Sequence, residues 1–229
     1  MPLGRFVCKS TELTKNEVAL LINDGAVVVN DEVIINEADQ VHENDQITLD
    51  GQRLKARSFR YILMDKPQNT ICSNIDEIYP SLFNFLDIDK VFELYVTGRL
   101  DVDTIGLVFV TDVGRWSFNI RTPSKQCEKV YRVGLSRPID EGVVCRFAEG
   151  VKLQGKLKLT LPAELEIINL NEVLLRIIEG KFHQVKRMFS AVGNKVVSLH
   201  REKIGHISLD VEVGKWRYLT LNEVNSFNN

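Results

Sequence analysis

Cysteine is scarce in this sequence, and no two cysteines form a Cys-x-x-Cys pair. The four that occur lie far apart, at Cys8, Cys72, Cys127 and Cys145. This spacing excludes a zinc ribbon and a thioredoxin-type redox motif, and it favours reduced, mostly buried thiols. Three of the four histidines lie near one another but lack acidic or thiol companions at ligand spacing, so no metal site is predicted.

Long apolar runs and nucleotide-binding motifs are also missing. No stretch approaches the roughly 18 apolar residues of a membrane span, and the first residues contain no apolar run of signal-peptide length. We therefore expect a soluble cytoplasmic protein. The sequence has no Gly-x-Gly-x-x-Gly, no P-loop and no internal repeat, so a nucleotide cofactor is not implied.

Neither sign of charge dominates the whole chain, but the two signs are unevenly distributed. The formal net charge of −2 argues against a protein that coats nucleic acid non-specifically. Residues 1–56 contain five Lys or Arg against ten Asp or Glu, a net charge of −5. Residues 179–203 contain six Lys or Arg against two Glu, a net charge of +4. The sequence therefore predicts a basic face formed late in the chain.

The first part of the chain reads as a small helix-plus-strands module. Thr14-Lys-Asn-Glu17 is a capping box, and apolar residues recur behind it at helical spacing until Gly25. Short strands are predicted at residues 26–30, 32–35 and 46–49. The Arg- and Lys-containing stretch that follows is typical of an exposed linker. We predict a module at residues 1–56, a linker at 57–60 and a second domain at 61–229.

The second domain has the irregular alternation of strands and helices that is typical of an α+β fold. A mixed, largely antiparallel sheet flanked by helices is favoured over a doubly wound parallel sheet. The expected strands are residues 61–64, 107–110, 129–135, 164–168, 173–178, 195–199 and 206–211. The expected helices are residues 80–86, 114–120, 140–149 and 183–192.

A charged loop precedes the most apolar of these strands. Asp101 lies in Gly98-Arg-Leu-Asp-Val-Asp-Thr-Ile-Gly106, just before a short, β-rich run that predicts a strand covered on both faces. A rigid strand is what a positioned reactive side chain needs, so Asp101 is the candidate catalytic group. A calcium loop is disfavoured because its later ligand positions are apolar. A solvated aspartate paired with Arg99 stays open as the alternative.

Two further stretches carry candidate binding residues. Tyr131 shares a strand face with Lys129, and an aromatic ring among cations suits stacking on a base beside phosphates. An ordinary half-buried tyrosine is the alternative. In residues 179–193 a turn leads into a helix with a core stripe of Val185, Met188, Phe189 and Val192. Lys186 lies off that stripe near the helix start, where the helix dipole does not stabilise a cation, which suggests another partner such as Asp101. A solvated surface cation stays open as the alternative.

Taken together, these stretches resemble the pseudouridine synthases of the RsuA branch. The resemblance rests on Gly98-Arg-Leu-Asp-x-x-Thr-x-Gly-Leu, on the Lys-x-Tyr that ends at Tyr131, and on Glu179-Gly-Lys-Phe-His-Gln-Val-Lys-Arg-Met-Phe, in this order. Asp65-Lys-Pro67 and Leu199-His-Arg-Glu-Lys-Ile-Gly205 extend it over about residues 59–220. The first module looks like an S4 RNA-binding domain. Its opening Pro2-Leu-Gly-Arg-Phe6 departs from the usual Arg-Leu-Asp-Lys-Phe, which puts strong RNA binding by that module in doubt.

The resemblance implies roles for particular residues. Asp101 would be the essential aspartate, Tyr131 the ring packed on the target uracil, and Lys186 the basic partner of the aspartate. Arg99 would help to hold a flipped-out nucleotide, and Arg201 would contact the RNA backbone or line the site. The other predicted RNA-binding residues are Lys129, Arg132, Lys181, Gln184, Arg187, Lys195 and Lys203.

The implied reaction is isomerisation of one uridine of 16S rRNA to pseudouridine, which needs no cofactor. The partner would be the rRNA or a small-subunit assembly intermediate, and a monomer is expected. Three alternatives stay open at this point. They are a noncatalytic S4-type assembly factor, a large-subunit rRNA synthase of the same branch, and a glycoside hydrolase that uses Asp101 and Asp103.

Overall fold

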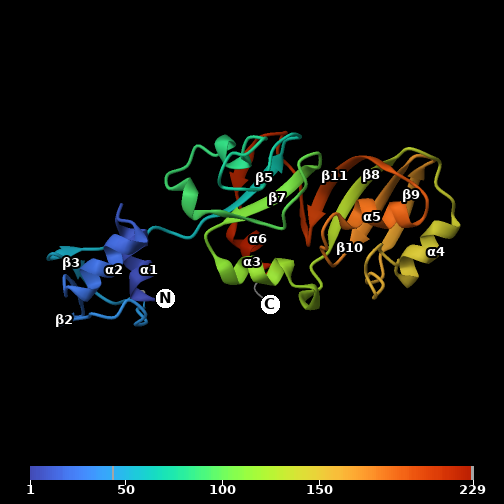
Figure 1. Cartoon of the computed structure of the whole chain (residues 1–229). Coiled ribbons are helices and arrows are strands. Elements are labelled where there is room, and N and C mark those ends of the chain that lie inside the picture. The colour runs from blue at the N-terminus through green and yellow to red at the C-terminus, as the bar shows by residue number, and fades with distance from the viewer. Residues whose placement is uncertain (43, 228–229) are drawn as a thin grey trace. The chain divides into compact units, whose positions relative to one another are not determined.

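The chain folds into two compact units, Met1–Ser58 and Phe59–Asn229. The computed structural model describes residues 1–42 and 44–227. Figure 1 shows both units in one colour ramp from the N-terminus to the C-terminus. The division falls inside the stretch 57–60 that the sequence marks as a linker. Each unit is described separately below.

The first unit packs two helices beside a small sheet. Thr14 and Glu17 form the predicted capping box in front of α2, with the Glu17 amide donating to the Thr14 hydroxyl. Within the described residues of this unit the strand order is β2-β1-β3-β4. The elements are α1 (Leu3–Ser10), α2 (Lys15–Asn23), β1 (Val27–Val29), β2 (Glu32–Val33), β3 (Ile47–Leu49) and β4 (Gln52–Arg53).

The unit has a core of its own, built mainly from the inner faces of the two helices and from β1 and β3. The buried side chains of this core are Leu3, Val7, Val18, Ile22, Val27, Val41 and Ile47. Helix α1 is absent from the sequence prediction. It begins at Leu3, and the preceding Pro2 makes no capping hydrogen bond, so the polar start signal that marks α2 is missing here.

The second unit is built on one large sheet. Among the described strands the order is β13-β5-β7-β11-β8-β10-β9, with β12 paired to β11 and β6 to β7. Of the paired strands described, only β7 and β11 run parallel, so the predicted mixed, largely antiparallel sheet is confirmed. The strands are β5 (Tyr61–Lys66), β6 (Tyr95–Thr97), β7 (Ile105–Thr111), β8 (Lys129–Leu135), β9 (Glu164–Asn169), β10 (Glu172–Ile177), β11 (Val196–Ile204), β12 (Ile207–Ser208) and β13 (Trp216–Tyr218).

Helices flank this sheet. The predicted helix at residues 80–86 is wrong in type, because only a 3₁₀ turn forms there, with Ser81 capping it through a bond from the Phe83 amide. The other predicted helices are close to expectation. Helix α6 and strands β6 and β13 were not predicted, and of the strand predicted at residues 206–211 only Ile207–Ser208 forms, as β12. The elements are α3 (Gly114–Arg121), α4 (Gly142–Glu149), α5 (Gln184–Ala191), α6 (Leu221–Asn225) and the 3₁₀ turns η1 (Leu82–Phe85), η2 (Val91–Glu93) and η3 (Pro123–Lys125).

Strand β7 has the predicted cover on both faces. Leu107 and Phe109 pack in one cluster with Trp116 of α3, whereas Val108 and Val110 pack in another that lies on the η1 side. All four of these strand residues have no exposed surface. A strand buried on both faces is fixed along its whole length, so the loop that enters it has a rigid base.

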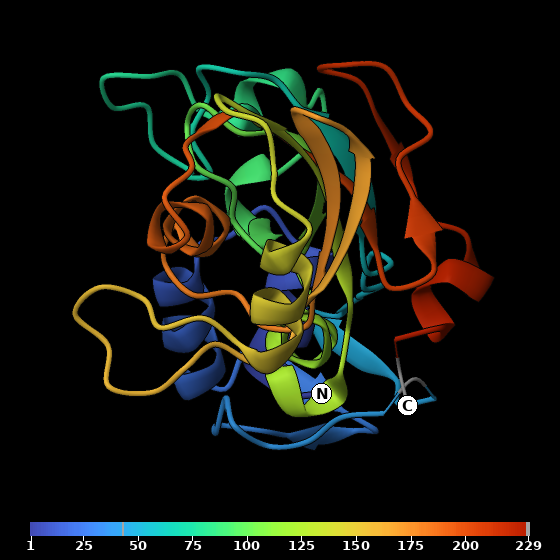
Figure 2. The ribbon, with the colours of Figure 1, turned by 90° about the vertical axis from the view of Figure 1, so that its right-hand side faces the viewer.

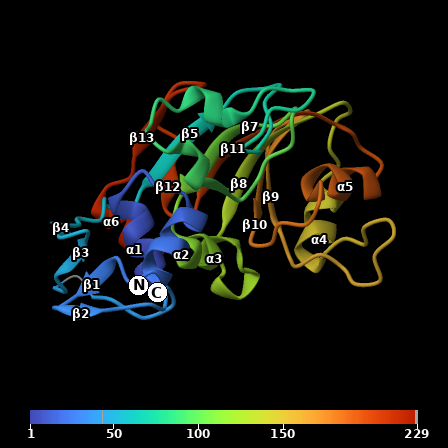
Figure 3. The ribbon, with the colours of Figure 1, turned by 60° about the vertical axis from the view of Figure 1, so that its left-hand side comes forward.

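Helices α4 and α5 cover one face of β8, β10 and β9. Phe147 of α4 and Phe189 of α5 meet with ring centroids 5.0 Å apart and are fully buried. Val185 and Met188 of the predicted stripe join the same core. The start of α5 therefore lies on the half of the sheet that contains β8 (Figure 3).

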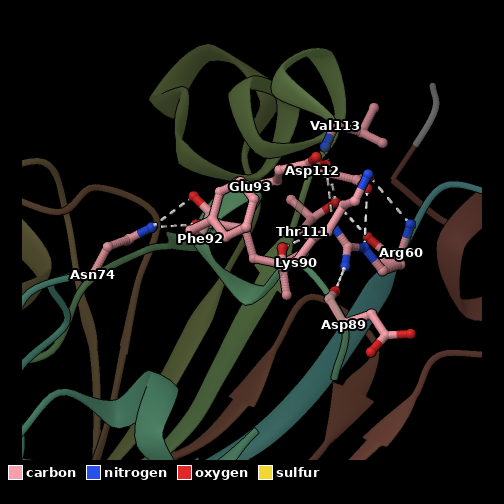
Figure 4. Close-up of polar contacts among 10 residues, drawn as sticks. Arg60, Asn74, Asp89, Lys90, Phe92, Glu93, Thr111, Asp112 and Val113 are labelled. Carbon is pink, nitrogen blue, oxygen red and sulfur yellow. Dashed lines mark hydrogen bonds and ion pairs between the residues drawn. The ribbon is translucent and has the colours of Figure 1, made fainter. Parts of the chain in front are cut away.

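A buried ion pair fixes the beginning of β5. The Arg60 guanidinium donates to Asp112 Oδ2 at 3.1 Å and to the Asp89 carbonyl at 2.5 Å, and it lies 3.5 Å from a Glu93 oxygen (Figure 4). The side chains of Arg60 and Asp112 are 8% and 7% exposed. This arrangement ties the segment before η2 to the ends of β5 and β7.

We expect Arg60→Met to lower the free energy of unfolding by about 3–5 kcal/mol, because the buried Asp112 carboxylate loses the Arg60 guanidinium. Urea denaturation of the purified protein would measure this loss. The double variant Arg60→Met, Asp112→Leu should recover part of the stability, since the buried carboxylate is removed together with the guanidinium. A single variant as stable as the wild type would contradict the assignment.

Candidate active site

The backbone of the loop before β7 is held by a buried lysine. Lys66 Nζ donates to the carbonyls of Thr104 at 2.9 Å, Pro67 at 3.1 Å and Val102 at 3.5 Å. The side chain is completely buried, and this burial lowers the pKa of Lys66. The Thr104 amide closes the loop by donating to the Asp101 carbonyl at 3.1 Å. Asp101 is therefore presented on a segment that is tied down on its inner side.

Gly106 lets β7 approach β11 closely at the end of this loop. Its φ is +109°, and a Cβ there would lie 2.4 Å from the Arg201 carbonyl oxygen. Arg201 lies opposite Gly106 on one side and opposite Tyr131 of β8 on the other. The Thr-x-Gly spacing of the motif thus brings the loop, β7, β11 and β8 together.

Lys186, in the first turn of α5, meets both loop carboxylates. Its Nζ donates to Asp101 Oδ2 at 3.0 Å and to Asp103 Oδ1 at 2.5 Å. Partial burial disfavours the charged forms, but the hydrogen bonds outweigh it, so the pKa of Lys186 is raised and the pKa of Asp103 is lowered. The side chains of Asp101 and Lys186 keep 28% and 27% exposure, so a substrate can reach the pair.

His183 also lies beside Asp101, a contact that the sequence does not predict. Its Nε2 lies 3.3 Å from Asp101 Oδ1. The Phe182 ring stacks on the imidazole with centroids 3.7 Å apart and is itself 77% exposed. His183 has a φ of +49° at the residue before α5, which a helix-start pattern does not reveal. Its position directly before the Gln-Val-Lys run is the one available sequence signal.

Tyr131 is connected to the loop through Arg201. Arg201 Nη1 lies 3.3 Å from the Tyr131 hydroxyl, and the guanidinium carbon is 5.8 Å from the ring centroid. The same guanidinium donates to the carbonyls of Gly98 at 2.6 Å and Leu107 at 2.7 Å. Leu100, next to Asp101, packs against the core cluster to which Tyr131 belongs. Tyr131 is 8% exposed, so its ring position is fixed.

Three of the predicted RNA-contacting residues have internal partners. Lys129 is buried and donates to the carbonyls of Ile120, Cys127 and Ile178, and burial lowers its pKa. The structure therefore differs from the prediction for Lys129, because a desolvated ammonium satisfied by main-chain oxygens is not available to phosphates. Arg201, 2% exposed, holds the site rather than facing solvent. Gln184 is also buried, bonded to the Glu179 carboxylate and the Lys181 amide.

The remaining predicted contacts differ in how freely they face solvent. Arg132 is ion-paired with Glu202 and Glu172 on the other face of β8. Lys181 pairs with Glu179 at 2.8 Å. Arg187 donates to the carbonyls of Phe182 and Gln154. Lys195 and Arg99 are exposed and Lys203 is half-buried, and no ion pair of these three side chains exists within residues 1–42 and 44–227.

No group of three or more His, Cys, Asp or Glu residues in the described part of the chain is placed to hold a metal ion. Likewise, no helix in that part is both long and apolar enough to cross a membrane.

Comparison with known proteins places the chain in a family. The model of the RNA pseudouridylate synthase family matches residues 60–191, which include Asp101, Tyr131 and Lys186. The chain belongs to this family, and it is an isomerase that forms pseudouridine in RNA.

Its curated relatives are more specific in name. The chain is 44% identical over 228 residues to ribosomal small subunit pseudouridine synthase A of Vibrio cholerae, with 99% of each protein covered. It is 41% identical over 229 residues to the protein of the same name from Escherichia coli K12, again with 99% of each covered. A crystal structure of a pseudouridylate synthase matches with a TM-score of 0.72 at 41% identity, covering 99% of both chains.

Proposed function

We propose that this protein converts one uridine of 16S rRNA in the small ribosomal subunit to pseudouridine, with Asp101 as the essential carboxylate. The names of the relatives support the substrate class. The observation that carries the residue assignment is the Lys186–Asp101 contact of 3.0 Å on a partly exposed, backbone-anchored loop. A carboxylate oriented in this way suits attack on, or proton removal from, a nucleoside.

The reaction sets the requirements for the site. The bond from uracil N1 to C1′ breaks, the base rotates, and C5 bonds to C1′; the C5 proton is lost and N1 gains a proton. Positive character develops at the sugar when the first bond breaks, as in glycoside cleavage. Asp101 would act at C1′, at the ring or at the 2′ proton, and in each version it must be ionised.

The neighbours of Asp101 fit supporting roles. Lys186 would orient the carboxylate, since its ammonium lies against Asp101 and Asp103. Tyr131, fixed through its hydroxyl by Arg201, would pack on the detached uracil and prevent its escape. His183 would hold the second oxygen of Asp101.

RNA binding would depend on cations of the second unit. Extracting the target nucleotide from its stack costs a few kcal/mol, least in loops and bulges, and phosphate contacts offset that cost. The proposed contacts are the exposed Arg99 and Lys195 and the half-buried Lys181, Arg187 and Lys203, with Arg132 on the other face of β8. The first unit would be an S4-like RNA-binding domain, and its net charge of −5 over residues 1–56 suits orientation more than affinity.

A cytoplasmic monomer that acts on rRNA or on a partly assembled small subunit is consistent with this proposal, because one chain supplies every residue of the site. The test is to incubate unmodified 16S rRNA and, in parallel, unmodified large-subunit rRNA with the purified protein and to map pseudouridine at single-nucleotide resolution. One modified position is expected. Modification confined to large-subunit rRNA would overturn the substrate assignment. Binding without conversion would favour the assembly factor, and release of free uracil would favour a hydrolase.

A further inference from the structure

The segment between α4 and β9 forms a hairpin-like loop that the proposed site does not include. We call residues 151–160 the basic hairpin. The Thr160 amide donates to the Val151 carbonyl at 2.9 Å, and the Val151 amide donates to the Thr160 hydroxyl at 2.8 Å. Val151 and Leu153 are buried in the core beneath α4 and α5. The base of the basic hairpin is therefore anchored, while its tip extends from the unit (Figure 2).

The exposed part of the basic hairpin is strongly cationic. Lys152, Lys156 and Lys158 all face solvent, and no acidic residue occurs from residue 150 to residue 163. Within the portion of the chain that the structure describes, none of the three ammonium groups has an ion-pair partner. Leu157, between two of these lysines, is 98% exposed. The cluster of unpaired ammonium groups on an anchored loop points to an anionic ligand, and Leu157 adds an apolar contact beside it.

The basic hairpin is tied to the helix that carries Lys186. Arg187 Nη2 donates to the Gln154 carbonyl at 2.6 Å, and its Nη1 donates to the Phe182 carbonyl at 3.3 Å. Lys186, the adjacent residue, contacts Asp101. Figure 3 shows the loop on the same side as α5, beyond the edge of the sheet. A strand of nucleic acid bound at Asp101 could therefore continue onto the lysines.

We propose that the basic hairpin is an RNA-docking surface whose lysines contact phosphates of the strand that flanks the target uridine, with Leu157 packed on an unstacked base or sugar. Phosphates are the partners that a cluster of unpaired ammonium groups recognises without further geometry. An apolar side chain beside them suits contact with a base that has left its stack. This proposal rests on the proposed function only in taking an RNA as the substrate.

The salt dependence of RNA binding tests the lysines. Affinity for a 16S rRNA fragment is measured against salt concentration in an Asp101→Asn background, so that turnover does not enter. The double variant Lys156→Gln, Lys158→Gln should reduce the slope of log affinity against log salt by about 1.4, which is about 0.7 for each lost single-strand phosphate contact. Leu157→Ser should weaken binding several-fold with an unchanged slope.

The matched control is Arg115→Gln, Lys215→Gln, which removes two exposed cations from α3 and from the turn before β13. It should leave the slope unchanged. If both double variants lowered the salt slope equally, the change would reflect only the net charge of the protein, and the proposal would be overturned. If the Lys156→Gln, Lys158→Gln variant bound naked RNA normally but bound an assembling subunit more weakly, the partner of the basic hairpin would be a ribosomal protein, and the proposal would be wrong. Failure of the active protein to form pseudouridine would overturn the proposed function but not this binding result.

Discussion

Asp101→Asn should fold, bind RNA with an affinity within about threefold of the parent, and form no measurable pseudouridine. We expect a rate loss of about 10⁴-fold or more, the scale seen when the central group of a catalytic set is removed. The substitution is nearly isosteric, and the asparagine carbonyl can still accept the bond from Lys186. What it removes is the negative charge and the nucleophilic or basic oxygen. Single-turnover assays with excess enzyme, combined with RNA binding, separate chemistry from affinity.

Asp103→Asn is the matched control for this prediction. Asp103 lies two residues away, also bonds Lys186, and has a side chain that is 56% exposed against 28% for Asp101. Its loss should reduce the rate by less than about tenfold, because it affects only the orientation and charge of the lysine. Turnover by Asp101→Asn, or an equal loss in both variants, would refute the assignment of Asp101.

Lys186→Met should lower kcat by about 10²- to 10³-fold while reducing stability by about 1 kcal/mol or less, since partly exposed ion pairs contribute little to folding. Without the ammonium, Asp103 loses the hydrogen bond and the positive charge that lower its pKa, so the pKa of Asp103 should rise. Because the pKa of Lys186 is raised in the folded protein, its contribution to stability is complete below the ordinary lysine value. That contribution is lost only as pH rises through the raised value.

Lys186→Arg and Arg187→Met are the controls for the Lys186→Met prediction. Arginine should recover part of the rate, because it can still pair with Asp101. Arg187→Met removes the neighbouring cation, whose bonds go to two carbonyls, and should change RNA affinity more than kcat. A melting temperature that falls in proportion to activity in Lys186→Met would instead make Lys186 a structural residue.

The sequence by itself determined the local elements and the reaction class. Alternation and apolar runs predicted β7 and β8, and the capping box predicted the start of α2, because these signals depend on residues a few positions apart. The same locality explains the errors. Helix α1 has no polar cap, and residues 80–86 carry a helix-like pattern that closes only as a 3₁₀ turn. The motif around Asp101 was readable because its residues are contiguous.

Only the tertiary structure decided which polar residues meet and which are hidden. Lys186 and Asp101 are 85 residues apart in sequence, and the pairing of β7, β11 and β8 brings Arg201 to Tyr131 across 70. From the sequence alone, a lysine in a strand is expected to face solvent. Lys129 instead donates to three main-chain carbonyls inside the protein. His183 lies beside Asp101 with its backbone in a left-handed conformation, which the sequence pattern does not predict. Burial and partner choice depend on contacts between distant segments, which composition and spacing do not encode.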